Sequence, residues 1–236
     1  MIDVFQKIKG GMIISCQSEG DDPFNTPSGV TLFAKAAHMA GAAGIRSQGL
    51  AKIRMIIKNV PLPMIGLLKG KFSDGTVKIT GSFRQVEQLV NLGCDIIAID
   101  GTFRLREGLT GPNFISEVKK RFPNCVIMAD IATYEEGIAC EAAGAQCLST
   151  TLSGYTPETQ HLPKDRPDFK LLESLVLKCK IPVIAEGKIK SPEDAAQMMK
   201  LGAFAVVIGT VITRPRVVMG WYNEAIKKKH TLNQIH

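Results

Sequence analysis

Short apolar runs recur along the chain and predict buried strands. Each run is four to six residues long, the length of a strand buried on both faces of a parallel sheet. The runs are MIISC at 12–16, AAGI at 42–45, PMIGLL at 63–68, DIIAI at 95–99, CVIMA at 125–129, AQCLS at 145–149, PVIA at 182–185 and FAVVI at 204–208. Between them lie segments with the 3.6-residue period of amphipathic helices, such as SFRQVEQLVNL and SPEDAAQMMKL.

The turns between helices and strands support a count of eight strands. Gly41, Gly93, Gly144 and Gly202 each end a helical segment, and prolines precede the strands that fall midway between them. Glycine supplies the left-handed conformation after a helix, while proline prevents the helix from continuing. Seven such turns join eight βα units.

Several predicted helices also carry start signals. Ser82 with Gln85, and Thr133 with Glu136, have the spacing of a capping box. Ser191 is followed by a proline, which is the favoured residue at the first helical position. These signals predict where three of the helices begin.

Eight buried strands alternating with helices predict a (β/α)₈ TIM barrel, with VFQKIK at 4–9 as a short extra N-terminal helix. An open doubly wound sheet is the alternative. That fold usually has a GxGxxG turn after its first strand, and SCQSEGDDP lacks this spacing. Because no linker or low-complexity segment interrupts the pattern, residues 1–236 are expected to form one domain.

The composition is that of a globular protein. The 236 residues are 45% hydrophobic and 22% charged, and the apolar runs are far shorter than the ~20 residues that a membrane span needs. The N-terminus lacks the features of a signal peptide. The six cysteines are scattered without a CxxC pair, as in proteins of a reducing compartment, so a cytoplasmic location is expected.

The net charge of +7 favours an anionic partner. Nucleic acid is disfavoured because lysines and arginines are spread along the chain and do not alternate with the few aromatic residues. We therefore expect a small anionic substrate, with no nucleic acid and no membrane. The oligomeric state stays open, with a homodimer among the alternatives.

Polar side chains follow every predicted strand. Barrel enzymes build their sites at the carboxyl ends of the strands, so these residues are expected to meet at one face. They are Gln17, Arg46, Lys69, Asp100, Asp130, Thr150, Thr151, Glu186, Gly209 and Thr210. No histidine stands among them, which removes the usual zinc ligands, and the cations would compete with Mg²⁺ for the carboxylates. No metal is expected.

The last two strands carry a phosphate-binding pattern. Gly187 follows the seventh strand, and Gly209 and Thr210 follow the eighth, with Arg214 shortly after. Glycines let backbone N–H groups approach an anion, and barrels often hold phosphate between these two loops. An arginine can grip the same phosphate with two hydrogen bonds.

The segments IISCQ, GIR, IGLLK, IAIDGTFRLR, MADIAT, STTLSGYT, AEGKIKSPEDA and VVIGTVITRP strongly resemble the N-acetylmannosamine-6-phosphate 2-epimerase family of bacterial sialic-acid catabolism. The resemblance covers roughly residues 8 to 228. It implies a phosphate-binding (β/α)₈ barrel that interconverts N-acetylmannosamine 6-phosphate and N-acetylglucosamine 6-phosphate without a cofactor. Two segments depart from the family pattern: 100–107 reads DGTFRLRE in place of D-A-T-x-R-x-R-P, and 79–82 reads ITGS in place of I-T-P-T.

The implied reaction assigns roles to the matched residues. Epimerisation at C2 needs an open-chain aldehyde, a group that moves the C2 proton and a group that serves the sugar oxygens. Lys69 and Glu186 match the family's catalytic pair, and we expect Lys69 at carbon and Glu186 at oxygen. A free lysine is protonated at neutral pH, so a nearby cation such as Arg46 would help it to act as a base. Gln17, Arg46, Asp130 and Thr150 are expected to position the sugar hydroxyls and the N-acetyl group.

Other interpretations remain open at this point. Glu186 could serve only as a structural ion-pair partner of Lys69. Lys69 could form a Schiff base in a class I aldolase, or the barrel could be a ribulose-phosphate epimerase or a non-catalytic RNA-binding sensor. A last expectation concerns SGYTPETQHLPKDRP at 153–167, which is longer than a usual βα loop and is predicted to close over the sugar with a hinge at Gly154.

Overall fold

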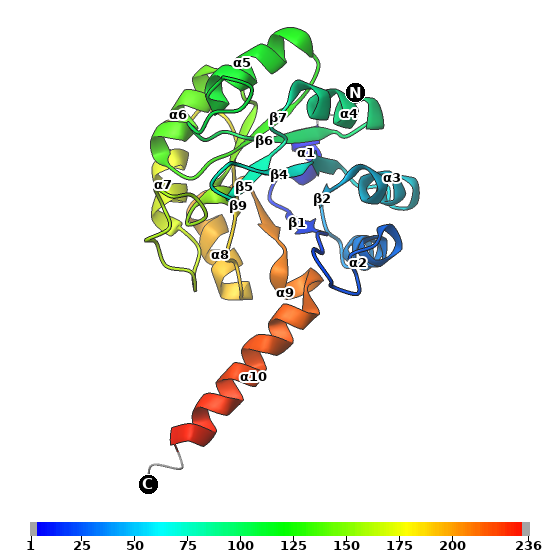
Figure 1. Cartoon of the computed structure of the whole chain (residues 1–236), viewed down its shortest axis with the longest axis vertical. Coiled ribbons are helices and arrows are strands. Elements are labelled where there is room, and N and C mark those ends of the chain that lie inside the picture. The colour runs from blue at the N-terminus through cyan, green and yellow to red at the C-terminus, as the bar shows by residue number, and fades with distance from the viewer. Residues whose placement is uncertain (1–3, 233–236) are drawn as a thin grey trace.

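The computed structural model describes residues 4–232 and contains a closed barrel of eight parallel strands, in the order β1-β10-β9-β8-β7-β6-β3-β2 (Figure 1). Each predicted apolar run supplies one of them. Their bounds are β1 Met12–Ser15, β2 Gly44–Gln48, β3 Met64–Leu67, β6 Ile96–Asp100, β7 Ile127–Asp130, β8 Cys147–Ser149, β9 Val183–Glu186 and β10 Ala205–Ile208. The predicted TIM barrel is therefore confirmed, and the open sheet is excluded.

Helices alternate with the strands around the barrel (Figure 1). Their bounds are α1 Val4–Ile8, α2 Pro27–Met39, α3 Leu50–Asn59, α4 Phe83–Leu92, α5 Gly111–Arg121, α6 Tyr134–Ala142, α7 Phe169–Lys178, α8 Pro192–Lys200, α9 Thr210–Thr213 and α10 Pro215–Leu232, with a 3₁₀ turn at Thr150–Leu152. Capping boxes begin α6 at Thr133 and α8 at Ser191. At α4, Ser82 accepts from the amide of Gln85, but the Gln85 side chain accepts from Gly81, so the predicted box is only half formed.

The core has two layers, because side chains of a strand alternate between its two faces. Ile45, Ala185 and the other outward residues pack against the helices. Inward residues such as Ile65, Met128 and Ile184 fill the barrel, and Ile8 of α1 joins them. The short extra helix expected at the N-terminus is thus part of the inner core. Most of the cysteines are buried and all six are free, as their apolar surroundings in the sequence indicated.

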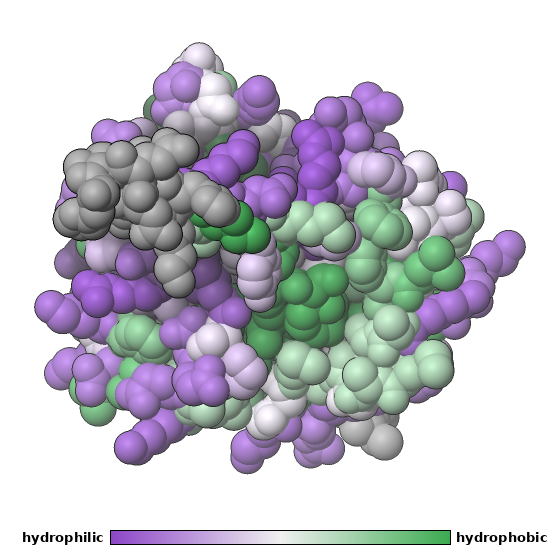
Figure 2. Space-filling view, turned by 90° about the horizontal axis from the view of Figure 1, so that it is seen from below, coloured by the Kyte–Doolittle hydropathy of each residue, from purple (hydrophilic) through white to green (hydrophobic). Residues whose placement is uncertain are grey.

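Two features were not predicted from the sequence. A hairpin of β4 Lys69–Lys71 and β5 Val77–Ile79 follows the third barrel strand and pairs only with itself. The last helix, α10, projects away from the barrel beyond α9 (Figure 1). Apolar side chains gather on the face from which it projects (Figure 2). Met219 and Tyr222 of α10 are exposed.

No helix in the described part of the chain is long and apolar enough to cross a membrane.

Candidate active site

A cavity of about 790 Å³ opens at the carboxyl ends of the strands. Eight of the ten residues predicted for the site line it: Gln17, Arg46, Lys69, Glu186, Gly187, Gly209, Thr210 and Arg214. They come from five of the eight strand ends, so the fold gathers side chains that lie up to 197 positions apart in the sequence (Gln17 to Arg214).

The floor of the cavity is a buried charge network around Arg46. This side chain is 1% exposed, and it is positioned by β2, in which Ile45 points outward and Arg46 inward. Arg46 donates to both carboxylate oxygens of Asp130 at 3.0 and 2.6 Å, and its Nη1 lies 3.3 Å from Glu186 Oε2. The single positive charge of Arg46 is thus shared by two carboxylates, so it can compensate only one of the two buried negative charges.

The Thr151 hydroxyl links the same two carboxylates, at 2.9 Å from Asp130 Oδ1 and 2.9 Å from Glu186 Oε2. A hydroxyl has only one proton to donate, so one carboxylate oxygen is left without it. Burial raises the pKa of Asp130 and of Glu186; the charge of Arg46 opposes this, and for Glu186 the neighbouring Asp130 charge adds to it. The pair therefore retains a proton more readily than free carboxyl groups do, as a general acid requires.

This geometry places two of the predicted sugar contacts outside the cavity lining. Thr150 is 2% exposed, and its hydroxyl is bonded to the backbone N–H and C=O of Glu186. Asp130 is fully buried behind Arg46 and Thr151 and does not line the cavity. Thr151, which does line it, takes the place expected for Thr150.

Lys69 stands at the rim and has a partner that the sequence did not reveal. It begins β4, its side chain is 33% exposed, and its ammonium contacts the carboxylate of Glu19 from the β1–α2 loop. Burial alone would raise the pKa of Glu19, but the charge of Lys69, with Arg214 and Lys52, lowers it overall. Glu186 pairs with Arg46 instead, so the alternative of a Lys69–Glu186 salt bridge is not borne out, and Arg46 is committed to the floor. Nothing in QSEGDD distinguishes Glu19 from an ordinary loop residue.

The opposite side of the cavity carries the predicted phosphate pattern. Gly187 has φ = +104°, a conformation that favours glycine, and Gly209 lies so close to Ser15 that a Cβ there would approach its side chain to 3.2 Å. Thr210 begins the short helix α9, and Arg214 follows its end. The Nε of Arg214 is buried and has no hydrogen-bond partner among the described residues, which leaves a donor for a ligand.

Among the side chains that the structure describes, no three from histidine, cysteine or acidic residues lie close enough together to hold a metal ion. The expectation that the reaction needs neither metal nor cofactor stays a prediction.

Comparison with known proteins identifies the family. The family model described as "Putative N-acetylmannosamine-6-phosphate epimerase" matches residues 30–228. The chain belongs to this family. Curated relatives named "Putative N-acetylmannosamine-6-phosphate 2-epimerase" include one from Caldanaerobacter subterraneus, 40% identical over 98% of both chains, and one from Clostridioides difficile, 40% identical over 95% of this chain and 99% of that one.

Solved structures agree with the family and with the fold. The N-acetylmannosamine-6-phosphate 2-epimerase from Clostridium perfringens superposes with a TM-score of 0.87 at 37% identity, covering 94% of this chain and 95% of that one. The thiamine phosphate pyrophosphorylase from Pyrococcus furiosus superposes with a TM-score of 0.60 at 16% identity and covers 89% of each chain, which is a likeness of fold alone.

The two departures from the family pattern meet in space. Glu107 has φ = +47°, which proline cannot adopt, and its carboxylate accepts from the amide of Phe83 at the start of α4 at 3.3 Å. Phe83 directly follows the other departure, at Gly81 and Ser82. Gly101 leaves no room for a side chain, because a Cβ there would lie 2.8 Å from Cys140 Sγ. Both departures therefore fit their local surroundings and lie outside the cavity lining.

The 153–167 loop borders the cavity through Tyr155 and Lys164. Lys188, itself part of the lining, donates to the carbonyl of Pro163 at 3.0 Å, and Gly154 has φ = +82°. The loop thus touches the wall of the cavity, and its closure over a bound sugar stays a prediction.

Proposed function

We propose that this protein is an N-acylglucosamine-6-phosphate 2-epimerase. It interconverts N-acetylmannosamine 6-phosphate and N-acetylglucosamine 6-phosphate by removing and returning the proton at C2 of the open-chain sugar, in the degradation of sialic acid and other amino sugars. The observation that carries the proposal is one cavity that combines a lysine, a buried carboxyl group and a free arginine donor in a chain of this family.

The ring-opening step needs a proton donor at the ring oxygen and a base at the O1 hydroxyl. Glu186 is suited to this work, because it lines the cavity while its raised pKa keeps a proton within reach. Two buried neighbours act on the pKa of Glu186 in opposite directions: the charge of Asp130 raises it and the charge of Arg46 lowers it. A sugar oxygen that loses or gains charge is then met by groups already fixed in position, with no reorganisation of solvent.

The carbon step needs a base at C2 and a donor for the enolate that results. Lys69 is the cavity residue proposed for this proton transfer. As an amine it accepts the C2 proton, leaving an enolate, and as an ammonium it returns a proton to C2. Glu19 keeps the lysine nitrogen over the cavity. The buried hydrogen-bond donor Nε of Arg46 and the acceptor Oε1 of Gln17, neither of which has a partner among the described residues, would bind the sugar oxygens and the N-acetyl group.

The phosphate is proposed to lie against Gly187, Gly209, Thr210 and Arg214. Support comes from the unpartnered Nε of Arg214 and from the two glycines, which leave backbone N–H groups accessible. The phosphate end and the lysine lie in the same cavity, so one sugar can contact both.

Proton NMR of N-acetylmannosamine 6-phosphate with the enzyme in D₂O tests the proposal. Signals of the 2-epimer should appear, and the C2 signal shows whether the proton exchanges with solvent. An unchanged spectrum at high enzyme concentration would contradict the proposal.

Treatment with borohydride in the presence of substrate distinguishes an epimerase from the alternative of a class I aldolase. Borohydride would trap a Schiff base on Lys69 and inactivate an aldolase, whereas an epimerase would stay active. Binding of total RNA in a gel-shift at physiological salt would instead support the RNA-binding sensor.

We further propose that the chain acts as a single-domain, cytoplasmic homodimer. The support for self-association is that α10 stands away from the barrel with Met219, Tyr222 and Ile226 exposed, and monomers seldom expose such a face without a partner. Sedimentation analysis tests it: a species of twice 25.6 kDa is expected, and a monomer at all concentrations would contradict it.

A further inference from the structure

The residue proposed for the carbon step does not belong to the barrel sheet. Lys69 begins a hairpin in which only three residue pairs are in register, Lys69 with Ile79, Gly70 with Lys78 and Lys71 with Val77. An isolated two-stranded hairpin is marginally stable in water. Because the hairpin also borders the cavity, whatever fixes it fixes the lysine.

The base of the hairpin is held by the barrel. Ile79 is 2% exposed and packs in the inner core, and Thr80 donates its backbone N–H to the carbonyl of Leu68 at 2.7 Å. The far end is a tight turn in which Phe72 donates to the carbonyl of Thr76 at 2.9 Å. Phe72 and Thr76 are both half-buried, although the turn between them is exposed. Lys78 of the hairpin lies 5.3 Å from the centre of the Phe72 ring, and further cover comes from outside the hairpin.

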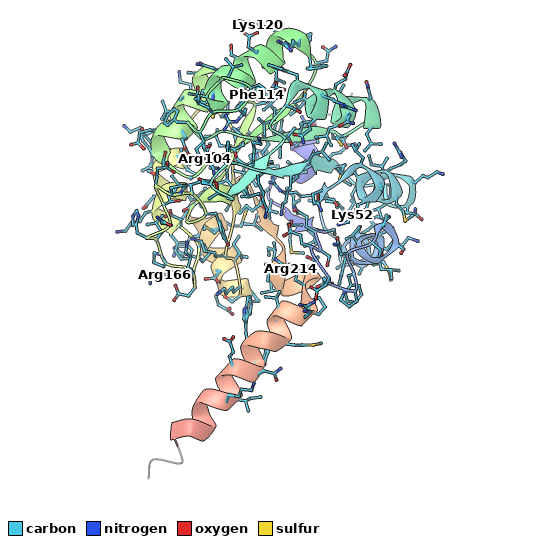
Figure 3. All side chains as sticks on the ribbon, viewed as in Figure 1. Lys52, Arg104, Phe114, Lys120, Arg166 and Arg214 are labelled. Atoms are coloured by element: carbon cyan, nitrogen blue, oxygen red, sulfur yellow. The ribbon has the colours of Figure 1, made fainter. Side chains whose placement is uncertain are left out.

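That cover is Arg104, from the loop after β6. Figure 3 labels it beside the hairpin. Its Nη1 donates to Thr76 Oγ1 at 2.7 Å, and its guanidinium carbon lies 4.1 Å from the centre of the Phe72 ring. The same side chain is tied to the barrel, because Nη2 donates to Asp100 Oδ2 at 3.2 Å and Nε to Thr102 Oγ1 at 3.0 Å. One planar group therefore joins the end of β6 to the turn of the hairpin.

A second arginine shows that charge balance alone does not require Arg104. Arg106 is fully buried and donates to Asp100 Oδ1 at 2.8 Å, so the carboxylate at the end of β6 already has a cation. The Arg106 guanidinium is 5.9 Å from the Phe72 ring and makes no hydrogen bond to the hairpin. Of the two arginines, only Arg104 donates both to Asp100 and to a residue of the hairpin, Thr76.

We propose that Arg104 is a positioning residue that holds the β4–β5 hairpin, and with it Lys69, in place over the cavity. It acts through the hairpin and does not touch the substrate, since it is not part of the cavity lining. The role rests on the proposed function, because it concerns the residue assigned to the carbon step. Lysine cannot replace it: an ammonium lacks the planar fork that stacks on Phe72 while it donates to Thr76 and Asp100.

The test compares Arg104→Lys with the matched control Arg121→Lys. The guanidinium of Arg121, at the end of α5, lies 3.5 Å from the Phe83 ring centre, so the control removes the same kind of stacking away from the hairpin.

Two measurements are made on each variant. Amide hydrogen exchange of residues 69–79 is followed without substrate, and kcat and KM are determined with substrate. Arg104→Lys should speed the exchange and lower kcat by about 10- to 100-fold, as expected for a misplaced catalytic group, with KM changed less than kcat. Arg121→Lys should change neither.

Chemical rescue adds a readout that general destabilisation does not move. Guanidinium ion at low concentration should restore part of the kcat of Arg104→Ala and none in the Arg121→Ala control. Hairpin exchange at the wild-type rate in Arg104→Lys, or an equal loss of kcat in Arg121→Lys, would overturn the proposal.

A further variant covers the case in which the arginine variants do not fold. Thr76→Val removes the hydroxyl that accepts from Arg104 and donates to Asp74 Oδ1 at 2.6 Å, and it leaves the pair of Arg104 with Asp100 intact. Asp74→Ala, which removes the bond inside the turn and leaves the Arg104 contact, is its control. Hairpin exchange that is faster in Thr76→Val than in Asp74→Ala supports the proposal, and exchange no faster than in Asp74→Ala refutes it. A wild-type protein that does not epimerise the 6-phosphate sugar defeats the proposed function instead, since the exchange measurement needs no substrate.

Discussion

The floor and the rim of the cavity are built in opposite ways. On the floor, Arg46, Asp130 and Glu186 are 1%, 0% and 12% exposed and are fixed by several charge-assisted hydrogen bonds. At the rim, Lys69 and Glu19 are 33% and 41% exposed, and the contact between them is the one ion pair that either makes with a described residue. Charges without water interact strongly, while exposed pairs contribute little to stability. The floor is thus a rigid electrostatic environment, and the rim depends on loops for its geometry.

The difference matches the two kinds of proton transfer proposed. Oxygen atoms gain and lose charge during ring opening, and a preorganised buried network serves that step. The carbon proton must be collected on one side of the sugar and returned on the other, which suits a flexible lysine on a hairpin. The predictions below separate these contributions, beginning with the largest expected effect.

Lys69→Ala should abolish the carbon step, because it removes the only group proposed to move the C2 proton. Solvent exchange at C2 and turnover are expected to vanish together, with a loss at or above the roughly 10²–10⁴-fold typical of a general base. Proton NMR in D₂O measures both. Lys71→Ala, which removes another lysine of the same hairpin, is the matched control and should lose far less. If Lys69→Ala still exchanged the C2 proton, the base would lie elsewhere.

Glu186→Gln should slow the oxygen step while leaving the floor in place. Glutamine keeps the shape and hydrogen bonding of glutamate but cannot exchange a proton. A loss in kcat of about 10²–10⁴-fold with little change in KM is expected. Steady-state kinetics at neutral pH decide it, and a near-normal kcat would make Glu186 a structural partner of Arg46 only.

Arg214→Ala should act on binding. It removes a charge-assisted hydrogen bond to the phosphate, worth roughly 1.5–3 kcal/mol, so KM is expected to rise by about one to two orders of magnitude. The matched control is Arg216→Ala, two positions along, which removes an exposed cation paired with Asp21 and outside the cavity. An unchanged KM in Arg214→Ala would remove this arginine from the phosphate site.

Glu19→Gln should have a smaller effect at the rim. The glutamine can still accept a hydrogen bond from Lys69, but the attraction between opposite charges is lost, so the lysine is held less firmly. A fall in kcat of about two- to fivefold is expected, in keeping with an exposed pair worth roughly 1 kcal/mol or less. The control is Asp21→Asn in the same loop. Wild-type kcat in Glu19→Gln would show that Lys69 needs no partner there.

Much of the floor could be predicted from the sequence by the two-residue period of strands. Met128 and Ile184 point into the barrel, and Asp130 and Glu186 each stand two positions later on the same face. The same rule explains why Thr150 lies outside the cavity lining after β8, the sixth barrel strand along the chain. Cys147 points inward, so Ser149 and Thr151 follow it, whereas Thr150 falls on the other face and bonds to the β9 backbone.

The arrangement of the rim could not be predicted, because its residues lie in a hairpin and a loop whose sequences show neither the helical nor the strand period. The hairpin at 69–79 has too few apolar residues to read as strands, and it owes its place to Ile79 and to Arg104, which is 25 residues further along the chain. The partnership of Lys69 with Glu19 joins residues 50 apart and leaves no trace in either local pattern. Whole strands and helix starts are local properties, while the ion pairs of loops depend on the finished fold.

The smallest expected effect is on the free energy of unfolding, and it tests whether the buried carboxyl group of Glu186 retains a proton. Because burial raises the pKa of Glu186, the folded protein holds that proton more tightly than the unfolded chain, whose glutamates titrate near 4.3. The contribution of Glu186 to stability is therefore fully present below about pH 4 and is lost as the pH rises through its folded pKa.

The variant Glu186→Gln should show no such loss, because glutamine does not titrate. Its free energy of unfolding, measured by urea titration, should exceed the wild-type value at pH 8, and the gap should shrink as the pH falls toward 4. Glu173→Gln on the exposed face of α7 should show no such trend. A variant less stable than wild type at pH 8 would mean that the ionised Glu186 is fully compensated by Arg46, and that the floor holds no proton for the sugar oxygens.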